Sequence, residues 1–300
     1  MSPTIVKGPL QMIVSSFFFG LMAFYAKLAS VTVSGQEVVF FRFLLGVIAA
    51  LIMAALGRVD LRAQRKDLLI ARGIFGGTAI LLYFAAIAGG SVINSTVLNN
   101  SYPIYIVPLA ALFLKEKITW PVCLSLLAAW FGVGLLVHPD FTRIFWPDLL
   151  ALASGIVSAC AIVVVRQLRK SGEPAWTVFF YLSIFGLIAS LVCSLPVWVW
   201  PDANAWIYLS LTAVTGLFAQ VMMTSAYKYI NASAGSILSM TTMVFGSIFG
   251  LIGLGETMTF GEAAGALLIA LGGGMVAWLN SRENWEKFTA AGSAADRRMD

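Results

Sequence analysis

Long apolar runs recur along the whole chain, and short polar or charged stretches separate them. Each run is about 20 residues long, enough for an α-helix to cross a bilayer core of about 30 Å. The runs lack the strict alternation of apolar and polar residues that is typical of membrane β-barrel strands. The pattern predicts ten transmembrane helices, at Leu10–Ala29, Val38–Leu56, Leu68–Ala88, Val92–Leu114, Thr119–Val137, Leu149–Val165, Trp176–Val199, Trp206–Tyr227, Ala232–Leu254 and Thr259–Leu279.

The fourth and fifth predicted helices resemble the ninth and tenth at a constant offset of 140 positions (98 + 140 = 238). Identical residues at this offset include Leu98 and Leu238, Glu116 and Glu256, Thr119 and Thr259, Gly132 and Gly272, and Gly134 and Gly274. A match held without gaps indicates an internal duplication. Since each copy holds an odd number of helices, the second copy enters the membrane inverted relative to the first.

The sequence therefore predicts an all-α polytopic membrane protein built from two inverted five-helix repeats. The first repeat is expected over residues 10–137 and the second over residues 149–279. Residues 280–300 are polar and poor in apolar side chains, so a disordered cytoplasmic tail is expected there.

Composition supports a membrane protein. The chain is 60% hydrophobic and 11% charged, with a mean hydropathy of +0.90, whereas soluble domains carry about 25% charged residues. The net charge of +5 therefore indicates topology rather than a nucleic-acid partner. With the N-terminus inside, only Lys27, Arg42 and Arg143 of the 19 lysines and arginines fall in the outer half. We expect a multi-pass protein of the cell (inner) membrane with both termini in the cytoplasm.

A chain of two five-helix copies resembles the drug/metabolite transporter superfamily, in its EamA branch. The segment Pro103–Thr119 is close to that family's pattern of a proline, small apolar residues and a closing Gly-Glu-x-x-Thr, and Gly255–Thr259 repeats it. Lys115 stands where the family usually has glycine, and Arg42 resembles an arginine common in its second helix. The resemblance implies a secondary transporter but leaves the substrate open, because the family moves amino acids, vitamins, sulfonium metabolites and drugs.

Polar side chains in the middle of apolar spans are candidates for a substrate site, since such groups are costly in lipid. Asn99 and Tyr102 lie on one face of the fourth span, and Ser239 and Thr242 are their partners at the 140 offset. The spacing places them near the pseudo-two-fold axis at the bilayer centre, where this architecture binds substrate. Hydrogen bonding between helices is the alternative role. The full set of candidate substrate-binding residues is Asn99, Tyr102, Ser239, Thr242, Gln220, Thr224 and Tyr83.

Three charged residues near the outer ends of spans are candidates for a gate or an ion pair. Arg42 lies about 7 Å into its span by helical rise. It either pairs with Glu37, holds a substrate carboxylate or closes an outer gate, and a structural or gating pair is favoured. Lys27 either joins such a gate or extends its amine to the membrane surface. Arg72 is assigned to the inner positive belt, and Glu116 with Glu256 to tight turns between helices.

Absent motifs narrow the function. No Asp or Glu occupies the central turns of a predicted span, which disfavours a proton relay through a deep carboxylate. The chain has no phosphate loop ending in Gly-Lys-Ser/Thr, no metal motif and no nucleophile with its base. No cofactor or metal is therefore expected, and an intramembrane enzyme or a purely structural protein is disfavoured.

The leading hypothesis is a secondary transporter, favoured as an exporter, of a small polar metabolite such as an amino acid or related compound, working by alternating access. The alternative is an uptake carrier for a vitamin or sulfonium metabolite of the riboflavin or S-adenosylmethionine kind. The expected partners are the small-molecule substrate and the lipid bilayer, with no nucleic acid. A monomer and a homodimer both stay open.

Overall fold

The computed structural model of the protein describes residues 3–90, 92–137, 146–255 and 257–296. Within these ranges every regular element is a helix, and ten helical spans are long and apolar enough to cross a membrane. The ten spans predicted from the sequence are confirmed. The first half contains α1 (Pro3–Ala29), α2 (Gly35–Ala55), α3 (Lys66–Gly89), α4 (Val92–Asn99), α5 (Tyr102–Leu114) and α6 (Trp120–Val137). The second half contains α7 (Trp146–Lys170), α8 (Ala175–Ser194), a 3₁₀ turn η1 (Leu195–Val197), α9 (Ala203–Ala226), α10 (Ala232–Ser239), α11 (Thr241–Leu254) and α12 (Phe260–Asp296).

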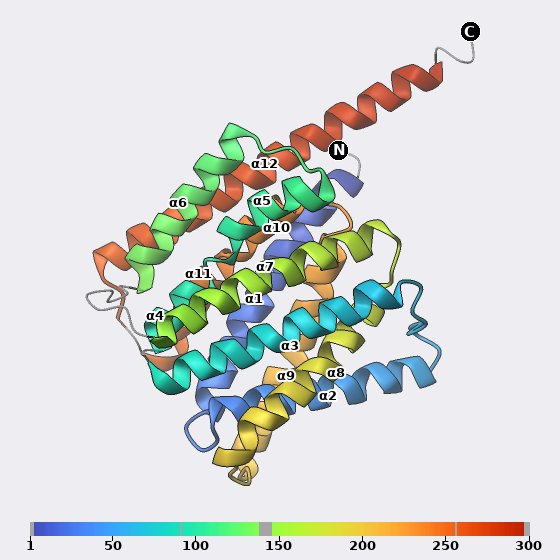
Figure 1. The fold of residues 1–300 in the computed structure, drawn as a ribbon. Coiled ribbons are helices and arrows are strands. Elements are labelled where there is room, and N and C mark those ends of the chain that lie inside the picture. Colours follow the sequence, from blue (N-terminus) through green and yellow to red (C-terminus); the bar gives the residue numbers. More distant parts are fainter. Residues whose placement is uncertain (1–2, 91, 138–145, 256, 297–300) are drawn as a thin grey trace.

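The two halves interlock. Helix α1 of the first half packs along α9 of the second, and α7 of the second half packs along α3 of the first. Helices α2 and α8 form a further pair, as do α6 and α12. Figure 1 shows the start of α1 and the end of α12 at the same end of the bundle, as an even number of spans requires. The observed fold is the inverted repeat predicted from the sequence.

The last helix differs from the prediction. Helix α12 continues to Asp296, so residues 280–296 are helical where a disordered tail is expected from the sequence. Figure 1 shows this end of α12 projecting beyond the other helices. The segment from residue 282 to residue 296 holds several alanines together with Glu, Lys and Arg, which favour helix, and the preceding span supplies the costly first turn.

Large apolar side chains lie on the outside of the bundle. Leu112 is 72% exposed, Phe131 is 63% exposed and Ile252 is 77% exposed. A soluble protein rarely exposes apolar residues on this scale. This surface therefore fits a hydrocarbon environment, in agreement with the length and composition of the spans.

Helices α6 and α12 approach each other closely through glycine. A Cβ atom at Gly132 would lie 2.6 Å from the carbonyl oxygen of Gly265 on the facing helix. Any side chain there would push the two backbones apart. The fifth and tenth spans thus pack by small-residue contact, which is the usual means of close helix association in membranes.

The two copies end their fourth and ninth spans in the same way. Lys115 follows α5 with φ 55°, and Gly255 follows α11 with φ 67°, so both residues are left-handed. Their backbone N–H groups donate to the carbonyl oxygens of Ala110 and Gly250 respectively. Glycine adopts this conformation at no steric cost, whereas lysine does not. Lys115, which stands where the family usually has glycine, is therefore a site of local backbone strain.

This pair generates a stability prediction. We expect Lys115→Gly to raise the unfolding free energy by up to about 1 kcal/mol, because it relieves the left-handed strain. Gly255→Ala should lower it by about 1 kcal/mol, since no atom lies within 4 Å of the new Cβ and only the backbone conformation is affected. Thermal unfolding of the purified protein in detergent measures both. Changes of equal sign in the two variants would contradict the prediction.

Candidate functional site

The fourth and ninth spans are interrupted at equivalent positions. The first break lies at Asn100 and Ser101, between α4 and α5, and the second lies at Met240, between α10 and α11. These positions are related by the same 140 offset (100 + 140 = 240). The sequence predicts two continuous helices here, so the breaks are a feature that apolar patterning does not reveal.

Hydroxyl groups satisfy the backbone at each break. Ser101 Oγ donates to the carbonyl oxygen of Leu98 at 2.6 Å, and Thr241 Oγ1 donates to that of Leu238 at 2.7 Å. Both donors and both acceptors are related by the duplication. In a membrane a freed carbonyl needs such a partner, because no water is available in the hydrocarbon. Pro103 adds to the first break, since it has no N–H to donate.

Hydrogen bonds connect the broken helices to their neighbours. The hydroxyl groups of Tyr102 on α5 and Ser239 on α10 lie 2.5 Å apart, which joins the two copies directly. Asn99 Nδ2 donates to Ser154 Oγ on α7 at 2.7 Å. These bonds fix the positions of the side chains on both sides of the first break.

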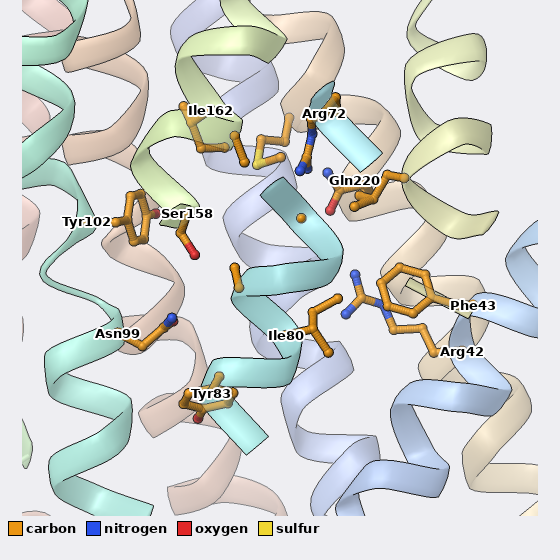
Figure 2. Close-up of a pocket in the computed structure, with 15 residues that line it drawn as sticks. Arg42, Phe43, Arg72, Ile80, Tyr83, Asn99, Tyr102, Ser158, Ile162 and Gln220 are labelled. Carbon is orange, nitrogen blue, oxygen red and sulfur yellow. The ribbon is translucent and has the colours of Figure 1, made fainter. Parts of the chain in front are cut away.

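A cavity of about 300 Å³ lies beside this break. Six spans contribute to its wall, from α2, α3, α4 with α5, α7, α8 and α9. Figure 2 shows Asn99, Tyr102 and Ser158 on one side of the cavity and Arg42 and Gln220 on the other. The lining residues are Arg42, Phe43, Arg72, Gly76, Ala79, Ile80, Tyr83, Asn99, Tyr102, Ser158, Ala161, Ile162, Leu182, Gln220 and Met223.

The cavity is cationic. Arg42 and Arg72 both line it, and none of its 15 lining residues is Asp or Glu. Arg72 is only 5% exposed, and its Nε atom is buried without a hydrogen-bond partner. Within the described part of the chain, neither guanidinium forms an ion pair or a hydrogen bond. The arrangement leaves two positive charges facing a small polar space.

The structure brings together four of the seven candidate substrate-binding residues. Asn99, Tyr102, Gln220 and Tyr83 all line the cavity. Asn99 and Tyr102 lie on either side of the break, and the Tyr83 hydroxyl lies 2.8 Å from Thr96 Oγ1.

The other three candidates lie outside the cavity wall. The Ser239 hydroxyl is hydrogen-bonded to the hydroxyl of Tyr102, and it also donates to the carbonyl oxygen of Ser236 at 2.7 Å. Thr242 is partly buried on α11. Thr224 on α9 is fully buried, and its hydroxyl group has no hydrogen-bond partner. It is not among the residues that line the cavity.

The candidate ion pair between Glu37 and Arg42 is not formed. Glu37 Oε2 accepts from the backbone N–H and the hydroxyl of Ser34, at 2.9 and 2.8 Å, and Oε1 accepts from Val199 N at 2.8 Å. The carboxylate therefore caps the start of α2 and holds the segment after η1. Arg42 faces the cavity instead. Lys27 is exposed in the last turn of α1, outside the cavity wall.

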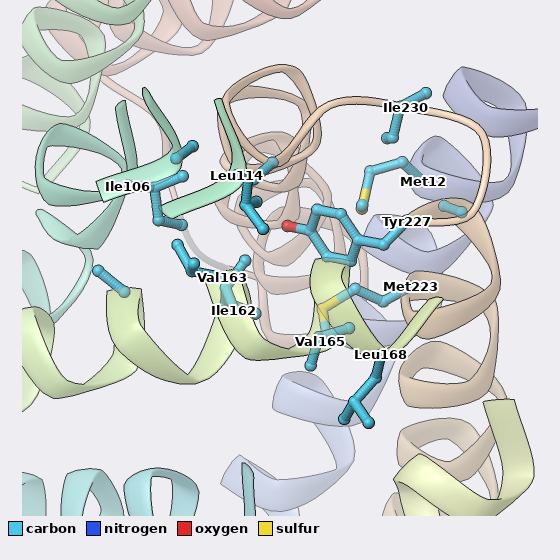
Figure 3. Packing of buried hydrophobic residues seen from close by; sticks show 14 of the residues in the cluster. Met12, Ile106, Leu114, Ile162, Val163, Val165, Leu168, Met223, Tyr227 and Ile230 are labelled. Carbon is cyan, nitrogen blue, oxygen red and sulfur yellow. The ribbon is translucent and has the colours of Figure 1, made fainter. Parts of the chain in front are cut away.

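One end of the cavity is closed by packed side chains. Ile162 and Met223 belong both to the cavity wall and to a buried cluster around Tyr227, which is fully buried. Figure 3 shows Tyr227 among Met12, Met223 and other apolar side chains from both halves of the chain. The side chains at this end of the cavity are therefore apolar and tightly packed among the described residues.

An ion pair lies at the same end of the bundle. Arg166 Nε donates to Glu116 Oε1 at 3.0 Å, and Arg166 Nη1 donates to the carbonyl oxygen of Tyr227 at 2.5 Å. Glu116 Oε2 accepts from Ala232 N at 2.8 Å. Glu116 therefore joins the first half to the second rather than only fixing its own turn, and Glu256 lies outside the described residues.

Arg72 is the main residue that sequence reasoning misplaced. Its nearness to the start of α3 suggested an inner basic belt, but its side chain reaches the cavity. A usable signal was present. Arg72, Gly76, Ala79 and Tyr83 are separated by four, three and four residues, which places them on one helical face.

Comparisons with known proteins agree with the fold. A sequence model of the EamA-like transporter family matches residues 6–138 and again residues 145–278. The pseudopaline exporter CntI of Pseudomonas aeruginosa is 28% identical over 272 residues, which cover 88% of this chain and 94% of that protein. The S-adenosylmethionine uptake transporter of Rickettsia prowazekii is 24% identical over 236 residues, covering 78% of this chain and 79% of that one. A solved crystal structure at 18% identity has the same fold, with a TM-score of 0.77 over 92% of this chain and 98% of that chain.

The Arg166–Glu116 pair generates a second stability prediction. The two side chains are 13% and 9% exposed, so Arg166→Gln leaves a nearly buried carboxylate without its cation. We expect a loss of about 3 kcal/mol in unfolding free energy. The control is Arg65→Gln, which removes an ion pair with Asp67 whose side chains are 47% and 62% exposed. Such exposed pairs contribute little, so the control should leave the melting temperature in detergent nearly unchanged. Similar melting temperatures for the two variants would show that the buried pair is not structural.

Proposed function

The chain belongs to the EamA-like transporter family, and from this premise we propose that it exports a small polar metabolite, such as an amino acid or related compound, by alternating access. The proposal places this multi-pass protein in the inner membrane with both termini in the cytoplasm. The observation that carries it is the polar cavity beside the first helix break, between two inverted copies. Broken helices at a repeat interface are the usual substrate site of such transporters.

The dimensions of the cavity suit a small solute. Its volume of about 300 Å³ is at the lower end of the range for ligand pockets, which is about 300–1,000 Å³. Asn99, Tyr102, Ser158 and Gln220 provide amide and hydroxyl groups to a wall that also holds Arg42, Arg72 and Tyr83 and whose other members are apolar. Few polar groups in an apolar wall give orientation and specificity to a bound small molecule.

Alternating access requires that the closed end opens. The Tyr227 cluster and the Arg166–Glu116 pair both contain residues from the two halves. A relative movement of the halves would separate these contacts while the opposite end closes. Lys115, Lys117, Arg166 and Lys170 gather at this end, which supports a cytoplasmic location under the positive-inside rule. In this proposal the structure corresponds to a state closed toward the cytoplasm.

The alternative is uptake of a vitamin or sulfonium metabolite. The similarity to an S-adenosylmethionine uptake transporter favours it. Against it stands the charge of the cavity, because a sulfonium cation would face two guanidinium groups without a lining carboxylate. Similarity to the pseudopaline exporter, over more of the chain, supports export.

The proposal predicts loss of transport in variants of the cavity wall. Asn99→Ala removes a lining amide, and Tyr102→Phe removes the hydroxyl that reaches Ser239. We expect each to lower transport about tenfold, the equivalent of one lost hydrogen bond of about 1.4 kcal/mol. Thr242→Ala, a hydroxyl outside the wall, should leave transport unchanged.

The measurement has two stages. Untargeted mass spectrometry of the medium of overexpressing cells identifies the exported metabolite, and proteoliposomes then test its flux without ATP. Protein amounts in the membrane are matched for every variant. Flux that requires ATP, or no flux of any exported candidate by the wild-type protein, would reject the proposed function. Equal loss in all three variants would instead mean that the wall residues serve packing.

A further inference from the structure

We infer that the transported substrate is an organic anion whose acid groups are held by Arg42 and Arg72. The inference rests on the proposed function and names the substrate class of the same cavity. It starts from the juxtaposition of two guanidinium groups, on α2 and α3, in one small cavity without a lining carboxylate.

The position of Arg42 is fixed by apolar contacts. Its guanidinium lies over the ring of Phe43, 4.9 Å from the centroid. On the α9 side, a Cβ atom at Gly216 would lie 3.0 Å from Arg42 Nε. Glycine at this position therefore makes room for the side chain. The contacts hold the aliphatic and planar parts of Arg42 without using its hydrogen-bond donors.

Arg72 is accommodated in the same manner. A Cβ atom at Gly76, one turn along α3, would lie 2.7 Å from Arg72 Nη1. The missing side chain lets the guanidinium turn along its own helix into the cavity, as Figure 2 shows. With 5% exposure and an unpaired Nε, Arg72 is a buried cation that the described protein groups do not neutralise.

Two other arginines of the chain show the contrast. Arg166 pairs with Glu116, and Arg65 pairs with Asp67. An unpaired charge inside a membrane protein costs several kcal/mol and usually marks a functional pathway. Two of them in one cavity lower stability without a compensating ion pair or hydrogen bond among the described residues. A bound anion supplies the missing partner.

The chemistry of the wall specifies the ligand further. A guanidinium presents a planar fork of donors that matches a carboxylate or phosphate. Two such groups match a net charge of about −2, met by two carboxylates or one phosphate ester. On the opposite side, Asn99, Tyr102 and Ser158 offer uncharged hydrogen-bonding groups. These groups can form hydrogen bonds with the remaining polar atoms of the substrate. A cationic substrate would have no carboxylate partner among the lining residues.

The test uses the full-length protein purified in detergent, with ligand binding measured by thermal unfolding at constant ionic strength. The probes are succinate and glutarate as dicarboxylates, glycerol 3-phosphate as a phosphate ester, succinamide as a neutral isostere and S-adenosylmethionine as a cation. Succinate, glutarate or glycerol 3-phosphate should raise the melting temperature of the wild-type protein, and succinamide and S-adenosylmethionine should not. The two anion classes are separated by which of them stabilises at the lower concentration.

Variants connect the binding to the two arginines. Arg42→Gln and Arg72→Gln should each weaken the apparent affinity for the stabilising anion about 30-fold or more, as expected when one partner of a buried charge pair is removed. Without ligand, Arg72→Gln should melt at the same or a higher temperature than the wild type, because an unpaired buried charge is lost. Arg166→Gln, which breaks a protein ion pair, should melt lower. A lower melting temperature for Arg72→Gln would mean that Arg72 is structural.

Several outcomes would overturn the inference. Equal stabilisation by succinamide and succinate, unchanged anion affinity in both glutamine variants, or no stabilisation of the folded wild-type protein by any anion would each do so. Failure here is distinguishable from failure of the proposed function. If the proteoliposomes transport a neutral or cationic metabolite, and the Arg42→Gln and Arg72→Gln variants transport it equally well, the transport function is supported and the inference of an anionic substrate is rejected.

Discussion

The interior of this protein depends on a constraint that lipid imposes on the backbone. A helix can be interrupted inside a bilayer only where its freed carbonyl groups find another donor. Ser101 and Thr241 supply that donor at the two breaks, each from three residues beyond the carbonyl that it satisfies. Because both breaks are stabilised in this way, Tyr102 at the first can reach Ser239 at the second. The contact between the copies and the cavity beside it both lie next to these two breaks.

The duplication gives a symmetric scaffold with an asymmetric interior. Three pairs of residues at the 140 offset line the one cavity, and they are Arg42 with Leu182, Ile80 with Gln220, and Tyr83 with Met223. In each of these pairs only one member is polar. The proposed alternating access uses the inverted helices that the duplication provides. In the proposed function, the difference between the two copies in these lining residues gives the site its chemical selectivity.

Much of the fold could be predicted from the sequence. The length of the apolar runs matches the thickness of the bilayer, and the constant offset of 140 positions indicates the internal duplication. Side-chain direction could not be predicted to the same degree. Glu37 was grouped with Arg42 by proximity along one helix, yet its carboxylate caps that helix through Ser34. Glu116 and Arg166 are 50 positions apart, and only tertiary packing joins them. Local periodicity reports which face a residue occupies, while ion pairing depends on helices far apart in the sequence.

The two cavity arginines also bear on the transport cycle. Occlusion removes water from the cavity, and the cost of burying a charge rises as water leaves. An empty cavity with Arg42 and Arg72 therefore resists closure more strongly than one in which an anion neutralises them. The Tyr227 cluster closes one end by apolar packing, which is insensitive to the charge of the ligand. Under the proposed anion binding, selectivity and the energetics of closure arise from the same pair of guanidinium groups, and a residue change that alters one alters the other.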